Sequence, residues 1–95
     1  MPLFTLIGRD RPGAGELRVR TRDAHLAYLA GHGAAVKLGG PFMDAAGAST
    51  GSLVIVEAAD LAAAQVIAAA DPYAQAGLFD TLAVEPWRVV VGELA

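Results

Sequence analysis

Hydrophobic positions form four short apolar runs, each bounded by turn-forming residues. Runs of this length, rich in branched and aromatic residues, are typical of β-strands. Pro86 in the last run indicates an edge strand or a bend, because proline has no N–H to donate to a sheet. The predicted strands are residues 3–7, 35–38 and 53–56 and a segment between 78 and 91.

Residues 15–30 have the spacing of a helix rather than of a strand. Leu26 and Leu29 fall on one face of this helix, with Arg18 and Arg22 beside them. The chain therefore predicts a helix between its first two strands.

Two aspartates occupy positions that favour helix starts. Asp60 precedes a helical segment over residues 61–70, and its carboxylate can accept hydrogen bonds from the first free N–H groups. Asp71 precedes Pro72, a residue well suited to the first position of a helix. We expect one helix and one short helical turn here.

The predicted order β-α-β-β-α-β indicates a single α+β domain over residues 1–95 with a ferredoxin-like fold. In this fold, two helices cover one face of an antiparallel sheet. Residues 39–41 are expected to end the second strand, and residues 42–50 to form a loop. Residues 53–56 and 89–91 are apolar at consecutive positions, so the face without helices is also apolar. We expect that face to form a sheet-to-sheet homodimer.

Composition narrows the possible chemistry. The chain has 95 residues, of which 55% are hydrophobic and 18% charged, which excludes a disordered protein. It contains no cysteine, so disulfides and thiolate metal sites are excluded. A net charge of −3 argues against nucleic-acid binding through a basic surface. Without an evident signal segment or an apolar run long enough for a membrane helix, a cytoplasmic location and no membrane partner are expected.

Known cofactor motifs do not fit the glycine-rich segments. Gly13 and Gly15 begin a dinucleotide-like pattern, but Arg18 stands where its third glycine belongs. Gly31 and Gly33 fail in the same way at Val36. We therefore expect no cofactor, and two histidines are too few to indicate a metal site.

His25 is the residue with the clearest potential for chemistry. Arg18, Arg22 and His25 follow one another at i, i+4 and i+7, so they line one stripe of the helix. Two arginines beside an imidazole can receive an anionic small molecule. The alternative is a solvated helix face with a half-buried histidine.

Each of the other candidates has a structural interpretation beside the functional one. Asp71 is either only a helix cap or also a carboxylate that orients an imidazole. Tyr73 either offers a hydroxyl group or packs as a wedge. Ser52 is interpreted as a turn residue, since its neighbours in sequence include no base. Met43 and Trp87 are expected in the core or at an interface.

Four segments, in order, resemble the YciI-like (YCII-related) family. They are Arg22-Asp23-Ala24-His25-Leu26-Ala27-Tyr28-Leu29, Gly40-Pro41, Thr50-Gly51-Ser52 and Asp71-Pro72-Tyr73, the last followed by Gly77. The resemblance runs from the first strand to Trp87, and it implies a dimeric α/β barrel of ferredoxin-like domains. It also implies that His25 and Asp71 form a His–Asp dyad in a cleft, with Arg22 and Ser52 beside it. One relative of this family is a dehydrochlorinase acting on a chlorinated hydroxyhydroquinone.

Three functions follow as hypotheses. The first is a cofactor-free enzyme in which His25 is a general base, Asp71 orients it, and Arg22, Ser52 and Tyr73 bind a small acidic or phenolic substrate. Such a base would support an elimination or an isomerisation. The second is a non-catalytic, ligand-binding or accessory dimer, and the third a cofactor-free oxygenase. Contact between His25 and Asp71 distinguishes the first from the second.

Overall fold

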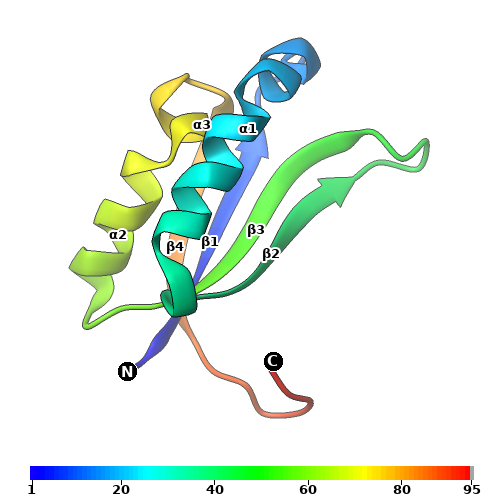
Figure 1. Ribbon diagram of the computed structural model, residues 1–95. Coiled ribbons are helices and arrows are strands. Elements are labelled where there is room, and N and C mark those ends of the chain that lie inside the picture. Colours follow the sequence, from blue (N-terminus) through cyan, green and yellow to red (C-terminus); the bar gives the residue numbers. More distant parts are fainter. Residues whose placement is uncertain (95) are drawn as a thin grey trace.

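A four-stranded antiparallel sheet forms the framework of the computed structural model, which describes residues 1–94 (Figure 1). Its strands lie in the order β2-β3-β1-β4, so β3 and β1 are central and β2 and β4 are edges. Neighbouring strands are antiparallel throughout. The strands are β1 (Leu3–Asp10), β2 (Val36–Met43), β3 (Ser49–Glu57) and β4 (Phe79–Trp87).

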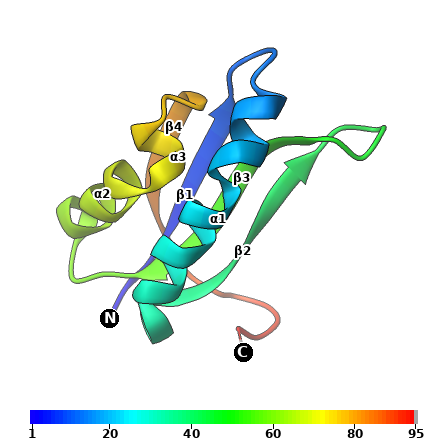
Figure 2. The same ribbon diagram turned by 45° about the horizontal axis from the view of Figure 1, so that its top comes forward.

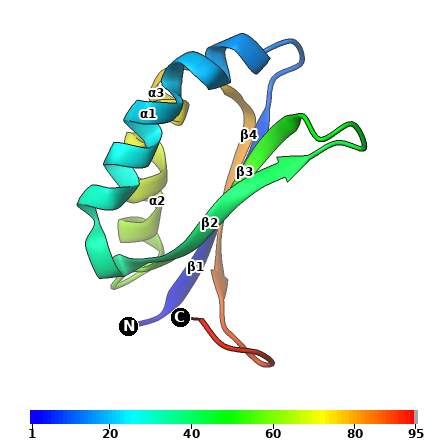
Figure 3. The ribbon, with the colours of Figure 1, turned by 45° about the vertical axis from the view of Figure 1, so that its right-hand side comes forward.

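The helices lie together on one face of this sheet (Figures 2 and 3). The two longer ones are α1 (Gly15–Gly31) and α2 (Leu61–Ala70). A short 3-10 turn, Gly33–Ala35, follows α1, and the four-residue helix α3 (Pro72–Gln75) follows α2. This arrangement confirms the predicted ferredoxin-like α+β fold.

The core lies between the central strands and α2. Phe4 and Leu6 of β1 pack with Val54 and Val56 of β3, because alternate residues of a strand point to the same face. Three alanines, Ala58, Ala64 and Ala68, complete the buried cluster. Small side chains let α2 approach the sheet closely, so the core is filled with few aromatic rings.

Strand boundaries differ from the sequence-based prediction at the edges of the sheet. Residues 39–41 do not end β2, which continues through them to Met43. Pro41 is tolerated there because an edge strand leaves one row of N–H groups unpaired. The predicted loop 42–50 is wrong as well: it shrinks to residues 44–48, where Asp44 Oδ1 accepts hydrogen bonds from the N–H groups of Ala46 and Ala48.

The last strand is shorter than its apolar run. β4 ends at Trp87, so the expected strand residues 89–91 lie beyond it, and Val90 and Val91 are exposed. Met43 and Trp87 are 65% and 40% exposed, so neither belongs to the core of the chain.

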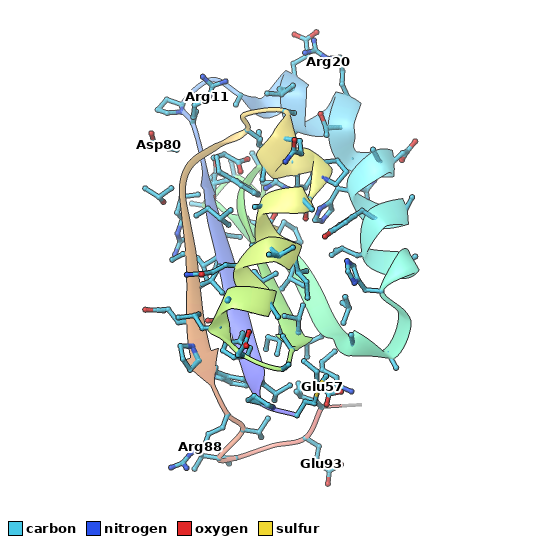
Figure 4. The ribbon with its side chains drawn as sticks, turned by 90° about the vertical axis from the view of Figure 1, so that its left-hand side faces the viewer. Arg11, Arg20, Glu57, Asp80, Arg88 and Glu93 are labelled. Atoms are coloured by element: carbon cyan, nitrogen blue, oxygen red, sulfur yellow. The ribbon has the colours of Figure 1, made fainter. Side chains whose placement is uncertain are left out.

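Charged side chains labelled in Figure 4 lie toward the two ends of the domain. Arg11, Arg20 and Asp80 lie toward one end, and Glu57, Arg88 and Glu93 lie toward the other. Lys37 of β2 forms an ion pair with Glu57, the last residue of β3. No helix within residues 1–94 is long and apolar enough to cross a membrane.

Candidate functional site

A cavity of about 730 Å³ opens between α1 and the β2–β3 hairpin. Pockets that hold small molecules commonly have volumes of about 300–1,000 Å³. Its lining includes two arginines, one histidine, two serines and one tyrosine but no carboxylate from the described residues. The polar members are Arg18, Arg22, His25, Ser49, Ser52 and Tyr73.

His25 and Asp71, 46 residues apart in sequence, are hydrogen-bonded. Nδ1 of His25 lies 2.9 Å from Oδ1 and 2.8 Å from Oδ2 of Asp71. Both residues are buried, with 7% and 8% of their surface exposed. A carboxylate only accepts, so the Nδ1–H group of His25 donates to Asp71.

This bond fixes which ring nitrogen of His25 is available. With the proton on Nδ1, a neutral imidazole keeps an unprotonated, basic Nε2. Nε2 has no hydrogen-bond partner among residues 1–94, and no fully buried side-chain nitrogen or oxygen of those residues lacks a partner. Nε2 is therefore accessible, and His25 lines the cavity. Asp71 instead borders a hollow of about 20 Å³ next to it, so a ligand meets the imidazole first.

The start of α3 holds Asp71 in place. Its Oδ1 accepts a hydrogen bond of 2.8 Å from the backbone N–H of Tyr73, as expected for an N-cap. The Tyr73 ring then stacks on the His25 ring, with 4.0 Å between centroids and 17° between planes. One turn of helix thus supplies both the carboxylate and the aromatic support for the imidazole.

A second buried network lies beside this pair. Nε and Nη2 of Arg18 donate to Asp10 at 2.6 and 2.9 Å, and Nη2 also donates to Ser52 Oγ at 2.8 Å. The Arg18 guanidinium lies over the Tyr73 ring, 4.7 Å from its centroid. The hydrogen bond to Asp10 raises the pKa of Arg18, so its charge is permanent. The fork-like pairing leaves Arg18 little freedom to move.

Arg22 has a different environment from Arg18. It lines the cavity but is exposed, and no carboxylate of the described residues lies within ion-pair distance of it. Burial raises the pKa of Tyr73, although the positive charges of Arg18 and Arg22 oppose that shift. The Tyr73 phenol therefore stays protonated at neutral pH. The arginine side chains give this wall of the cavity a positive charge.

All five predicted site residues lie around one place in the fold. His25, Arg22, Ser52 and Tyr73 line the cavity, and Asp71 lies directly behind His25. The turn interpretation of Ser52 is wrong, because the strand begins earlier and Ser52 lies buried within β3.

Sequence reasoning missed the tie between Asp10 and Arg18. Asp10 lies beyond the predicted strand 3–7 but is the last residue of β1, and Arg18 was expected beside the apolar face of the helix but is buried. Leu26, expected on that face, is 47% exposed. The eight-residue separation of Asp10 and Arg18 crosses a turn, so no periodic pattern signals their contact. Among residues 1–94, no cluster of three or more His, Asp or Glu side chains is arranged to hold a metal ion.

Comparison with known proteins identifies relatives that match nearly the whole chain. The sequence profile of the YCII-related domain matches residues 2–88. Protein YciI of Escherichia coli O6:H1 is 36% identical, with 93% of this chain and 98% of that protein aligned. An uncharacterized protein of Haemophilus influenzae is 34% identical over 92% of this chain and 97% of its own length.

A solved structure has the same fold. It is the 5-chloro-2-hydroxyhydroquinone dehydrochlorinase TftG of Burkholderia phenoliruptrix AC1100, in complex with 2,5-dihydroxybenzoquinone. The TM-score is 0.85 and the identity 36%, over 90% of this chain and 93% of TftG.

Proposed function

The chain belongs to the YCII-related family, and we propose that it is a small cofactor-free enzyme in which a His25–Asp71 dyad performs general-base chemistry. The proposed substrate is a small acidic or phenolic molecule, and the reaction an elimination or an isomerisation. The observation that carries the proposal is the hydrogen bond between two buried residues far apart in sequence.

The dyad suits proton abstraction. Nε2 of His25 takes a proton from the substrate, and the carboxylate of Asp71 stabilises the imidazolium that forms. In an elimination, the electron pair of the broken C–H or O–H bond moves into the substrate, and a leaving group such as chloride departs with its bonding electrons. TftG, a dehydrochlorinase of the same fold, makes this reaction type the first to test.

In this proposal, Ser52 and Arg22 bind the oxygen on which negative charge develops. A guanidinium has no acceptor, so Ser52 can only accept from Arg18 and cannot return its own proton to it. The Ser52 hydroxyl donates to no other residue among those described, so it is available to a ligand in the cavity. Arg22 adds an uncompensated positive charge, and Tyr73 contributes a further polar group to the wall.

We also propose that the protein acts in the cytoplasm as a homodimer formed through the sheet face opposite the helices. Leu38 and Trp87 lie on that face and are 44% and 40% exposed. Figure 3 shows the described helices on the other side of the sheet. Sedimentation equilibrium is the measurement: a dimer is expected, and a monomer at micromolar concentration would contradict it.

The direct test is turnover of 5-chloro-2-hydroxyhydroquinone, followed by chloride release, together with deuterium exchange into related phenols. We expect His25→Ala to lower the rate by roughly 10²–10⁴-fold because the general base is lost. His32→Ala is the matched control, since His32 does not line the cavity. Full activity of a folded His25→Ala variant would refute the dyad. Absence of both reactions in the wild type would favour the non-catalytic ligand-binding module.

A further inference from the structure

At most glycine positions of this chain, the structure shows why a residue with a side chain would not be tolerated. A Cβ on Gly8 or Gly51 would come within 2.5 Å of another atom. Five others adopt a positive φ, which other residues rarely tolerate. Four of the eleven remain without either reason, and three of those four line the cavity. The four are Gly15, Gly31, Gly39 and Gly40.

Gly39 is the one that matters for the shape of the cavity. It lies opposite Val54 in the β2–β3 ladder, and Val54 also lines the cavity. Residues directly opposite each other in an antiparallel pair project to the same face, so a side chain at position 39 would enter the cavity. Gly40 lies opposite Leu53, which does not line the cavity, so a side chain there would project to the other face.

The backbone at position 39 would accept a larger residue. A Cβ there would meet Leu53 O and Val54 Cγ2 at 3.4 Å, an ordinary contact distance. Glycine within a strand is destabilising relative to residues with side chains. The absence of a side chain at Gly39 therefore does not serve the fold, and its effect is to leave space in the cavity.

We propose that Gly39 is a specificity-determining residue whose missing side chain keeps the cavity wide enough for a flat, ring-bearing anion. The opposite wall, on α1, supplies the apolar side chains of Leu26 and Leu29. A ring can lie between these side chains and the β2 backbone at Gly39. Arg22, whose positive charge lines the cavity, favours a negatively charged ligand. The width of the cavity at this point depends on β2 and α1, and the class of ligand rests on the proposed function.

The test compares two ligands of one chemistry and different width, salicylate and 3-hydroxy-2-naphthoate. Their dissociation constants are measured by ligand fluorescence, and NMR shifts of His25 and Tyr73 locate the binding. In Gly39→Val, we expect the naphthoate affinity to fall by about 10-fold or more, because overpacking a filled site is costly. The salicylate affinity should change by less than about 3-fold, since the smaller ring leaves room for the added methyl groups.

Gly31→Val is the matched control, because Gly31 is the remaining glycine of the four and does not line the cavity. It should leave the ratio of the two affinities unchanged. Loss of fold at position 39 would lower both affinities together, and Gly39→Ala then provides a milder variant with the same expected direction. An unchanged ratio in folded Gly39 variants, or no binding of either ligand to the wild type, would overturn the proposal. The experiment measures binding and not turnover, so the ratio of the two affinities tests the proposal even if the wild type shows no turnover.

Discussion

Asp60 and Asp71 begin two consecutive helices with the same local chemistry and very different surroundings. Each carboxylate accepts a 2.8 Å hydrogen bond from a backbone N–H group in the first turn. Asp60 is exposed at the start of α2, whereas Asp71 is buried at the start of α3 and also binds His25.

The comparison separates a local role from a tertiary one. A cap needs only its own helix, so its consequences end with the stability of that helix. Asp71 in addition has a partner on α1, and replacing Asp71 therefore changes a group that lines the cavity. Substitutions made in parallel at the two positions distinguish these effects.

The largest difference is expected in turnover. Asparagine keeps the capping oxygen and removes the charge. Asp71→Asn should lower the rate of the proposed reaction by roughly 10²–10⁴-fold, because the imidazolium loses its counter-charge and the imidazole its defined tautomer. Asp60→Asn should stay close to wild type in the same chloride-release assay. Equal rates for the two variants would reduce Asp71 to a cap.

The next largest difference between the two aspartates is expected in the free energy of unfolding after substitution by alanine. Asp60→Ala should cost about 1 kcal/mol, the usual value for a lost cap. Asp71→Ala also strands the buried N–H of His25, an added cost of about 1–3 kcal/mol. Urea denaturation measures both free energies of unfolding. Similar midpoints for the two variants would mean that the His25 contact contributes little to stability.

The tautomer of His25 gives a finer comparison. Long-range ¹⁵N–¹H spectra should show the proton of neutral His25 on Nδ1 in the wild type and in Asp60→Asn. Asp71→Asn presents an amide that can also donate, so the Nε2–H tautomer should gain population. His32 serves as the reference within each spectrum. A wild-type His25 protonated on Nε2 would contradict the geometry of the dyad.

The smallest effect is expected on the pKa values of Tyr28 and Tyr73. Burial is the main cause that raises the pKa of Tyr28 and Tyr73 above the ordinary value of 10.0, and the negative charge of Asp71 adds to it in both. Absorbance titration should show both phenols ionising above that value. Asp71→Asn should bring their pKa values partly back, whereas Asp60→Asn should leave them unchanged.

The same shifts predict the alkaline stability of the protein. A tyrosine whose pKa is raised in the folded state stabilises that state, and this contribution is fully present below the pKa of the unfolded chain, 10.0. That contribution is lost as the pH rises through the folded pKa. The free energy of unfolding should therefore decline from about pH 10 upward, and less steeply in Asp71→Asn.

Sequence patterns predicted elements with local causes and missed contacts between elements. The caps at Asp60 and Asp71 and the apolar stretch of β3 follow from local rules, and the structure confirms them. The extent of β2 does not, because pairing with β3 carries an edge strand through two glycines and a proline that would end an isolated strand. Ser52 was misjudged for the same reason: its place in β3 depends on pairing with β1 and β2.

The sequence by itself determined the order of strands and helices, the helix starts and the five candidate residues. Their causes are short-range, since a cap, a turn and an alternating run each act within a few residues. The resemblance to the family implied that Asp71 meets His25, and the tertiary structure supplied the geometry of that contact. Only the tertiary structure decided that Asp10 holds Arg18 against Ser52 and that Gly39 faces a cavity. Those contacts depend on how α1 and α3 pack on the sheet and on the register of β2, which long-range burial and pairing set together.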